Sequence, residues 1–322
     1  MKKYLLIALA SLAPLTSGIA QVNVVEASFL PTEVDLSLRL EPGSLWRQQV
    51  QFQSELITAD GKRSLWTFNY KLRFRCLDVR DGIYSVDGKF VDWMLRLETD
   101  DCRYEWHDGI FQTYGEVVPE DGEITDGCRS LLFAWSAGLR MANLRFDLDR
   151  GGNVTRLSGL DKLRMKVSRA LVLLPEGIPQ DLLEFFGQDG LERADCALAF
   201  GLSVPRPVGL IKPGAAWEHS CEVGGIIDGL CQVNREFRYS GTGQERRHRF
   251  ALVELSPSFK TLNEKGEWVE IPVAKQPTTI TNPNYLRVLI DSGLTYGMRL
   301  SLLRSGSDGR LSRFQIDSNF VE

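Results

Sequence analysis

Histidine is scarce in this sequence, and the usual marks of an enzyme are missing. The 322 residues include only three histidines, so His-centred catalytic and metal sites have little material to work with. No G-x-S-x-G elbow, P-loop or dinucleotide fingerprint is present, because the glycine-rich pieces are all turn-sized. The cysteines form no C-x-x-C pair, and their spacings do not fit a zinc site. The sequence therefore predicts no catalytic, metal-binding or cofactor-binding residue, and an enzyme is the less favoured interpretation.

Charge of one sign and long apolar runs are also lacking. The 38 Lys and Arg residues nearly balance the 42 Asp and Glu residues, which gives a net charge of −4. A broad nucleic-acid-binding surface is not expected at this charge, so no nucleic-acid partner is predicted. After the first 20 residues no apolar stretch approaches the roughly 18 residues of a membrane-spanning helix. We therefore predict no transmembrane span in the mature chain. The 43% hydrophobic content excludes a disordered protein.

The N-terminus has the three parts of an export signal. The chain begins with two lysines, continues with an apolar run over residues 4–15, and then offers Gly18 and Ala20 as a small-x-small cleavage site. The apolar run is too short to cross a bilayer, although a membrane anchor is the alternative interpretation. We expect residues 1–20 to be a signal peptide and the protein to be periplasmic or secreted.

The six cysteines suit an oxidising compartment. They are an even set and allow up to three disulfides. Cys221 and Cys231 flank a glycine-rich connection between two predicted strands, so these two positions could face each other across a hairpin and are the nominated bridge. For the other four the pairing stays open: Cys76 and Cys196 are buried thiols or a long-range pair, and Cys102 with Cys128 is a further candidate.

Alternation of apolar and polar residues predicts antiparallel strands over most of the chain. From Trp66 to Cys76 every second residue is apolar, which indicates one buried and one solvated sheet face. The segments 91–97 and 102–106 repeat the pattern, and hairpins are expected at Asp108-Gly109 and around Gly151-Gly152. Between residues 161 and 202 the spacing becomes helical.

These patterns predict an α+β fold that is mostly antiparallel β. After the signal peptide we expect an irregular lead-in (21–33), a first β-rich half (34–160), a helical segment (161–204) and a second β-rich half (205–322). Curved sheets packed against the helices would form a half-barrel and bury the tryptophan-rich strand faces. Such a shape can enclose an apolar cavity.

A short motif near the start of each half indicates an internal duplication. Pro42-Gly43-x-x-Trp46 recurs as Pro213-Gly214-x-x-Trp217, at an offset of 171 residues. The unit is a Pro-Gly turn followed by a strand whose first inward residue is an indole. We interpret the two β-rich halves as related, with convergence on a common turn geometry as the alternative. A weaker echo links residues 152–157 to residues 309–314.

Three segments, in order, resemble a family of uncharacterised exported bacterial proteins, a domain of unknown function. They are the hairpin LDRGGNV (148–154), the helical middle, and VPRPV (204–208) leading to the second Pro-Gly-x-x-Trp motif. The resemblance covers most of the mature chain and implies a β-rich periplasmic or secreted protein. It implies no catalytic residues, and the cysteines are not part of the family pattern.

Three further features have a binding and a structural interpretation, and we favour the structural one for each. Asp147-x-Asp149-x-Gly151 is similar to the start of a calcium loop, but its twelfth position is Ser158, so a hairpin tip is favoured. The basic run 245–249 could bind an anion, and a solvated strand face is favoured. The seven tryptophans fit a core better than a sugar-stacking platform.

The hypothesis that fits these features best is a non-enzymatic envelope protein that binds an apolar ligand, a lipid or another envelope protein. One alternative is a structural or surface-interaction module without a ligand pocket. The other is a secreted hydrolase acting on glycan or lipid. An apolar cavity, a solid core or a polar cleft in the interior would distinguish the three.

Overall fold

The computed structural model describes residues 33–115, 122–188, 190–191, 204–223, 231–262, 266–270, 284–305, 309 and 311–321. The predicted signal peptide and nearly all of the lead-in lie outside the described residues, as do residues 192–203 of the predicted helical segment.

Sixteen strands and three helices are described. The strands are β1 (Val34–Asp35), β2 (Leu45–Ile57), β3 (Arg63–Arg80), β4 (Ile83–Thr99), β5 (Cys102–His107), β6 (Ile110–Gly115), β7 (Leu144–Leu148), β8 (Val154–Ser158), β9 (Leu210–Ile211), β10 (Ala216–Val223), β11 (Cys231–Glu245), β12 (His248–Leu262), β13 (Trp268–Glu270), β14 (Tyr285–Leu289), β15 (Thr295–Ser305) and β16 (Leu311–Val321). The helices are α1 (Gly122–Met141), α2 (Asp161–Val172) and α3 (Gln180–Phe186).

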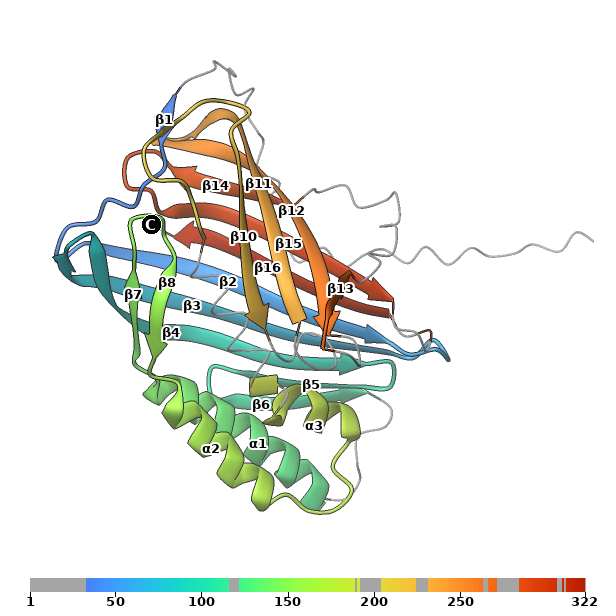
Figure 1. Cartoon of the computed structure of the whole chain (residues 1–322). Helices are drawn as coiled ribbons and strands as arrows, with labels where there is room; N and C mark the ends of the chain where they lie inside the picture. The colour runs from blue at the N-terminus through green and yellow to red at the C-terminus, as the bar shows by residue number, and fades with distance from the viewer. Residues whose placement is uncertain are drawn as a thin grey trace, which may run out of the picture.

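Fourteen strands form one open, curved sheet, which confirms the mostly antiparallel α+β prediction. The order along it is β10-β11-β12-β14-β15-β16-β2-β3-β4-β5-β6, with β13 on β12 and the β7–β8 hairpin on β4. The two halves of the chain meet where β16 pairs with β2. The helices lie together beneath the β4–β6 end of the sheet (Figure 1). Among the described helices, none is long and apolar enough to cross a membrane.

The strongest strand signal of the sequence is confirmed in β3. Its even-numbered residues from Trp66 to Cys76 are buried. In β4 the predicted alternation fails at one place: Leu95 and Leu97 are buried, but Val91 is exposed. The cause is a register shift, since Lys71 pairs with Asp92 and the next residue of β3 pairs with Phe90. The extra residue turns the Val91 side chain out of the sheet's buried face.

The core is an aromatic cluster between the sheet and the helices. The indole of Trp66 lies 6.1 Å from that of Trp135 on α1 and 5.9 Å from the ring of Phe186 on α3. Trp135 also donates a hydrogen bond of 2.8 Å from Nε1 to the Phe186 carbonyl. The helices therefore pack on the tryptophan-rich sheet face, as the core interpretation of the tryptophans requires. Four of the seven are buried, and two of these, Trp66 and Trp135, are fully buried; the other two are Trp46 and Trp106.

Helix α1 is the main element that the sequence analysis did not predict, because residues 122–141 fell within the first β-rich half. Two glycines let it pack closely. A Cβ at Gly138 would lie 2.7 Å from the Leu163 Cα on α2, and a Cβ at Gly127 would lie 2.7 Å from Ile178 Cδ1. Helix α2 begins at Asp161, where the predicted helical segment starts, and α3 begins directly after Pro179.

The two Pro-Gly-x-x-Trp motifs form the same local structure. Gly43 and Gly214 have φ values of 91° and 90°, and their amides donate to Cys76 O (2.8 Å) and Tyr239 O (2.7 Å). Each tryptophan then stacks on the phenylalanine opposite it. Trp46 lies 5.1 Å from Phe74, and Trp217 lies 5.4 Å from Phe237.

A second pair of matching turns lies between β7 and β8 and between β14 and β15. β7 pairs with β4 in the way that β14 pairs with β12, and the turns contain Gly152 (φ 75°) and Gly293 (φ 72°). The weaker echo of residues 152–157 in residues 309–314 is therefore not reproduced, because Gly309 precedes β16 rather than β15.

The cysteines form no disulfide among the described side chains. Cys76, Cys102 and Cys128 are free thiols. Burial raises the pKa of Cys128 to about 11, and the nearby Cys102 adds to this shift. The register pairs Cys221 with Val233 and Cys231 with Val223, so the nominated positions are diagonal neighbours rather than directly opposed. A diagonal separation of about 7–8 Å exceeds the usual Cα span of a disulfide. The side chains of Cys196, Cys221 and Cys231 lie outside the described residues.

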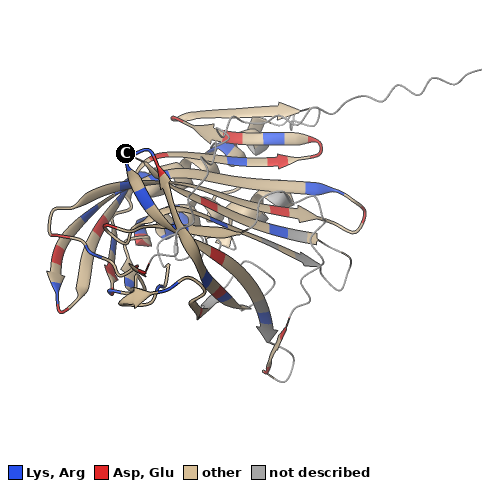
Figure 2. Ribbon diagram, turned by 90° about the horizontal axis from the view of Figure 1, so that it is seen from above, with Lys and Arg blue, Asp and Glu red and all other residues tan. Residues whose placement is uncertain are grey.

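Charged residues of both signs are interspersed along the strands (Figure 2). Several form cross-strand ion pairs, such as Lys71–Asp92 at 2.9 Å and Arg96–Glu105 at 2.8 Å. The pair Arg299–Asp317, at 2.6 Å, is the most buried of these three. The strand faces therefore carry no extended field of one sign.

Candidate functional site: the Arg206 pocket

Three segments that the sequence analysis singled out meet at one end of the β7–β8 hairpin. The amide of Arg206 donates to Gly151 O at 2.8 Å, and Trp217 Nε1 donates to Pro205 O at 2.8 Å. A Cβ at Gly152 would lie 2.8 Å from Val204 O and 3.0 Å from Arg206 Nε. The LDRGGNV hairpin, the VPRPV segment and the second Pro-Gly-x-x-Trp motif are thus in direct contact.

Arg206 is the most unusual side chain of this junction. It is 7% exposed, and its Nε donates to Val204 O at 3.0 Å. Its Nη1 has no hydrogen-bond partner among the described residues. Burial lowers the pKa of Arg206 to about 10, although the negative charge of Asp149 opposes the shift. The guanidinium therefore remains charged at neutral pH, with one donor group unused.

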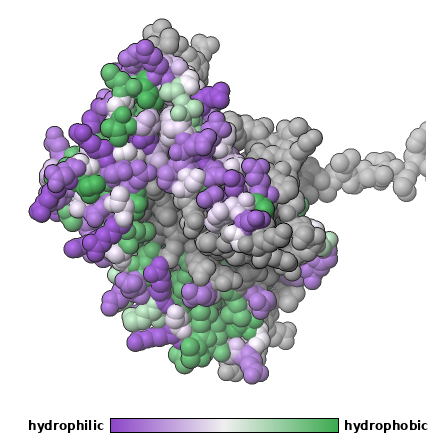
Figure 3. All heavy atoms as spheres, viewed as in Figure 1, coloured by the Kyte–Doolittle hydropathy of each residue, from purple (hydrophilic) through white to green (hydrophobic). Residues whose placement is uncertain are grey.

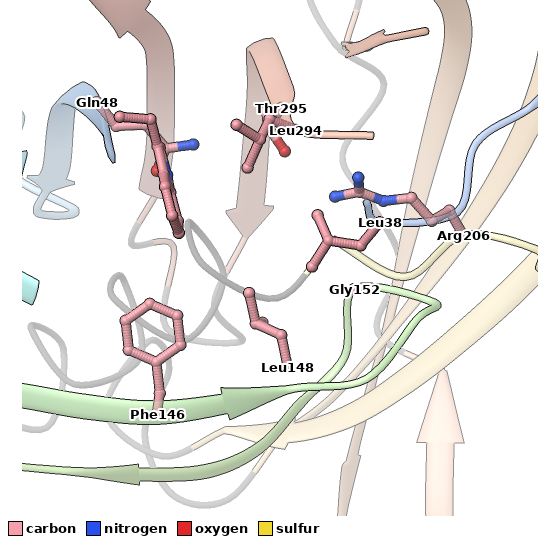
Figure 4. Close-up of a pocket in the computed structure, with 9 residues that line it drawn as sticks. Leu38, Gln48, Phe146, Leu148, Gly152, Arg206, Leu294 and Thr295 are labelled. Atoms are coloured by element: carbon pink, nitrogen blue, oxygen red, sulfur yellow. The ribbon is translucent and has the colours of Figure 1, made fainter. Parts of the chain in front are cut away.

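The Arg206 side chain lines a small pocket of about 20 Å³. Figure 4 shows the guanidinium of Arg206 pointing toward Thr295 and Leu294, with Gln48 on the far side of these two residues. A space of this size accommodates about one or two water-sized groups. The pocket is mixed in character, with polar groups from Arg206, Gln48 and Thr295 and an apolar remainder: Leu38, Trp46, Phe146, Leu148, Gly152 and Leu294.

Asp149 is held in place by the hairpin rather than by Arg206. Its carboxylate accepts from the Asn153 amide at 2.9 Å and from Asn153 Nδ2 at 2.8 Å. Asp147 accepts from Ser85 Oγ at 2.8 Å. Both carboxylates that were compared with a calcium loop are therefore engaged in the hairpin tip, which is the interpretation that we favoured. No cluster of metal-ligating side chains occurs among the described residues.

His219 and Arg235 lie opposite each other on β10 and β11, next to this junction. Arg235 Nη2 lies 3.1 Å from His219 Nδ1. Burial, followed by the positive charge of Arg235, lowers the pKa of His219, while Asp149 acts in the opposite direction. His219 is therefore neutral at pH 7, and it adds no positive charge to the surroundings of Arg206.

The remaining sequence candidates lie away from the pocket. His107 ends β5 and lies 4.0 Å from Asp92. His248 packs on the rings of Tyr296 and Phe320. The basic run 245–249 spans the β11–β12 hairpin, where Arg246 has a φ of 54°. None of them lines the pocket.

The backbone contact of Arg206 has a counterpart at Arg39, whose side chain differs in burial. The Arg39 amide donates to Ser292 O at 2.8 Å, as the Arg206 amide donates to Gly151 O. The guanidinium of Arg39, however, is 44% exposed and pairs with Asp35 at 3.4 Å. Two arginines thus occupy matching backbone positions, and only Arg206 is buried with an unused donor.

The polar residues of the pocket, Arg206, Gln48 and Thr295, were not predicted from the sequence to be functional. Arg206 stands between two prolines in a segment taken as a connection, and Gln48 lies on a strand face that is otherwise apolar. The one sequence feature that could have indicated the site is Gln48, a polar residue on the buried face of β2. The convergence itself depends on contacts between segments far apart in the chain.

Substituting Gly152 tests how tightly the junction is packed. We expect Gly152→Ala to lower the free energy of unfolding by about 2–4 kcal/mol, since the new Cβ meets Val204 O in a left-handed backbone conformation. Gly43→Ala is the matched control: it has a similar φ, but its Cβ would meet nothing within 4 Å. Denaturant unfolding of both variants is the measurement. Equal losses of stability in the two would contradict tight packing at Gly152.

No known family model matches this chain, and no curated protein matches it.

Proposed function

We propose that the protein is an exported, non-enzymatic binding protein of the bacterial envelope, and that its ligand or partner places a small anionic group in the Arg206 pocket. The observation that carries this proposal is the unused Nη1 donor of a buried, charged arginine beside a cavity. A buried charge without a full set of partners is costly, and a ligand that supplies an acceptor removes that cost.

The size of the pocket limits the anion. About 20 Å³ holds one or two water-sized groups, so a halide ion or the oxygens of one carboxylate fit, while a phosphate with four oxygens is too large to enter fully. A lipid chain is also too large, so this pocket does not support the enclosed apolar ligand that the half-barrel shape suggested. A single ordered water bridging Arg206, Gln48 and Thr295 is the competing occupant.

Export and family membership are part of the same proposal. They are supported by the signal-like N-terminus and by the resemblance to the uncharacterised exported family. Two of the segments that carry the resemblance contribute Leu148, Gly152 and Arg206 to the pocket wall. We propose that the LDRGGNV and VPRPV segments are a recognition element of that family, in addition to shaping the fold.

The test is thermal unfolding in formate, acetate, chloride and sulfate at matched ionic strength. We expect formate or acetate to stabilise the wild-type protein in a saturable manner, by about 2.7 kcal/mol at a concentration 100 times the Kd. Arg206→Gln should lose this response, and Arg39→Gln should keep it. Equal responses of wild type and Arg206→Gln, or no saturable response in either, would contradict the proposal.

A further inference from the structure

Helix α2 has a basic outer face. Leu163 and Val167 are its buried residues, on the side that packs against α1. By helical spacing, Lys162 and Arg169 lie on the side away from them, and the half-buried Lys166 lies on the flank between. The helix carries four basic residues and one acidic residue, in a chain whose net charge is −4. This segment is therefore locally cationic on an acidic protein.

The basic face ends in an exposed apolar tip. Val172 and Leu173, at the C-terminal end of α2, are 84% and 81% exposed, more than any other large apolar side chain described. Figure 3 shows apolar side chains gathered over the lower part of the molecule, where this end of α2 lies, with hydrophilic ones beside them. Two such side chains in succession, both facing water, are unusual on a soluble surface.

The other charges near this end do not cancel the basic face. Arg129 on α1 pairs with Asp126 at 3.1 Å, and Arg164 lies 3.9 Å from Asp161 at the start of α2. Glu176 is the exposed acidic side chain that follows the tip. Lys162, Lys166 and Arg169 thus remain as a basic stripe that leads to Val172 and Leu173.

From this arrangement we infer that the C-terminal end of α2 docks on the surface of an anionic lipid bilayer. A basic helix face with an apolar end matches such a surface, because the apolar side chains enter the acyl boundary while the lysines and arginine contact the headgroups. The stripe supplies the charge complementarity, and the tip supplies apolar area that nothing described covers. The inference is independent of the Arg206 pocket and goes beyond the proposed function.

Vesicle co-sedimentation of the full chain tests this inference. One set of vesicles is pure phosphatidylcholine, and in the other about a third of the lipid is phosphatidylglycerol. We expect the wild-type protein to bind the anionic vesicles at least about tenfold more strongly, and added salt to weaken the binding. Inorganic phosphate should release the protein from the vesicles no more effectively than the added salt does at the same ionic strength.

Three variants make the test specific to α2. Val172→Asp/Leu173→Asp should reduce binding to anionic vesicles by about tenfold or more, and Lys162→Gln/Lys166→Gln/Arg169→Gln should remove the preference for anionic lipid. The matched control is Leu45→Asp/Leu210→Asp, which alters two exposed apolar residues elsewhere, at 67% and 72% exposure, and should bind like wild type. Circular dichroism verifies that each variant is folded.

The inference is overturned if the wild type shows no preference for anionic vesicles, or if the α2 variants bind like the control. Arg206→Gln should bind vesicles like wild type, so failure of this inference and failure of the proposed function are separate results.

Discussion

Trp66→Ala is expected to lower the free energy of unfolding by about 3–5 kcal/mol, a large part of the roughly 5–15 kcal/mol that holds a typical domain folded. Trp66 is 0% exposed, and its indole contacts rings from the sheet and from two helices. Besides Trp135 and Phe186, these include Phe52 at 4.9 Å and Phe185 at 6.1 Å. Removing the indole leaves a cavity at the point where α1 and α3 join the sheet.

The size of this loss distinguishes a packed core from a ligand-binding interior. Nε1 of Trp66 has no described hydrogen-bond partner, so the cost comes from packing rather than from a lost hydrogen bond. Equilibrium denaturant unfolding is the measurement, and Leu45→Ala, at a site that is 67% exposed, is the control that should change little. A loss below about 1 kcal/mol for Trp66→Ala would mean that the sheet and helices are loosely packed.

Arg206→Met is expected to raise the free energy of unfolding in anion-free buffer by about 1–3 kcal/mol, which is opposite in sign to most core substitutions. Methionine keeps much of the apolar volume of the arginine stem and removes the buried charge. The variant should also lose the stabilisation by formate or acetate. Its gain is limited because Val204 O loses the donor Nε of Arg206.

The pH dependence follows from the direction of the pKa shift. Burial lowers the pKa of Arg206 to about 10 in the folded state. Above this pH the folded protein releases a proton that the unfolded chain still holds, so stability from this group rises with pH there. Below pH 10 the full cost of burying the charged guanidinium is present, and it is on the order of 3 kcal/mol. The difference between wild type and Arg206→Met should therefore stay level from about pH 6 to pH 9. If Arg206→Met instead lowers the free energy of unfolding by more than about 2 kcal/mol, the result would contradict this prediction. It would indicate that Arg206 stabilises the fold as a structural partner of Asp149.

Strand patterns were predictable from the sequence where the backbone is regular. In β3 every even-numbered residue from Trp66 to Cys76 is buried as the alternation predicts, although Thr67 on the other face is buried too. A pleated strand fixes side-chain direction with a period of two. The same rule gave the wrong face for Val91, since a bulge in β4 adds a residue whose presence depends on the pairing with β3. Bulges carry no reliable signal in a single strand.

Helix α1 was not predicted because two of its residues argue against a helix locally. Cys128, Leu131, Leu132, Trp135 and Leu139 have helical spacing and are all buried. Gly127 and Gly138 lower helix propensity, yet the close contacts with Ile178 and Leu163 leave no room for a Cβ at either position. The tertiary contact therefore requires the residues that local propensity disfavours.

The candidate site was predictable in part. The hairpin, the VPRPV segment and the Pro-Gly-x-x-Trp motifs were recognisable as distinct pieces, and their structural roles followed from turn chemistry. Their meeting around Arg206 depends on how the two halves are placed against each other, which no local pattern specifies. Arg39 illustrates this limit. It occupies a matching backbone position, but its side chain is partly exposed to solvent while that of Arg206 is buried.

The central claim, that Arg206 binds a small anion through its unused donor, is tested most directly by NMR of the arginine side chains during titration with formate. The account predicts that the guanidinium resonances of Arg206 shift saturably, and that those of Arg39 follow only the bulk salt effect. It also predicts that Gln48 and Thr295, which line the same pocket, shift with the same apparent Kd as Arg206. Resonances of Arg206 that stay unchanged through the titration, or that move only in step with those of Arg39, would contradict the claim.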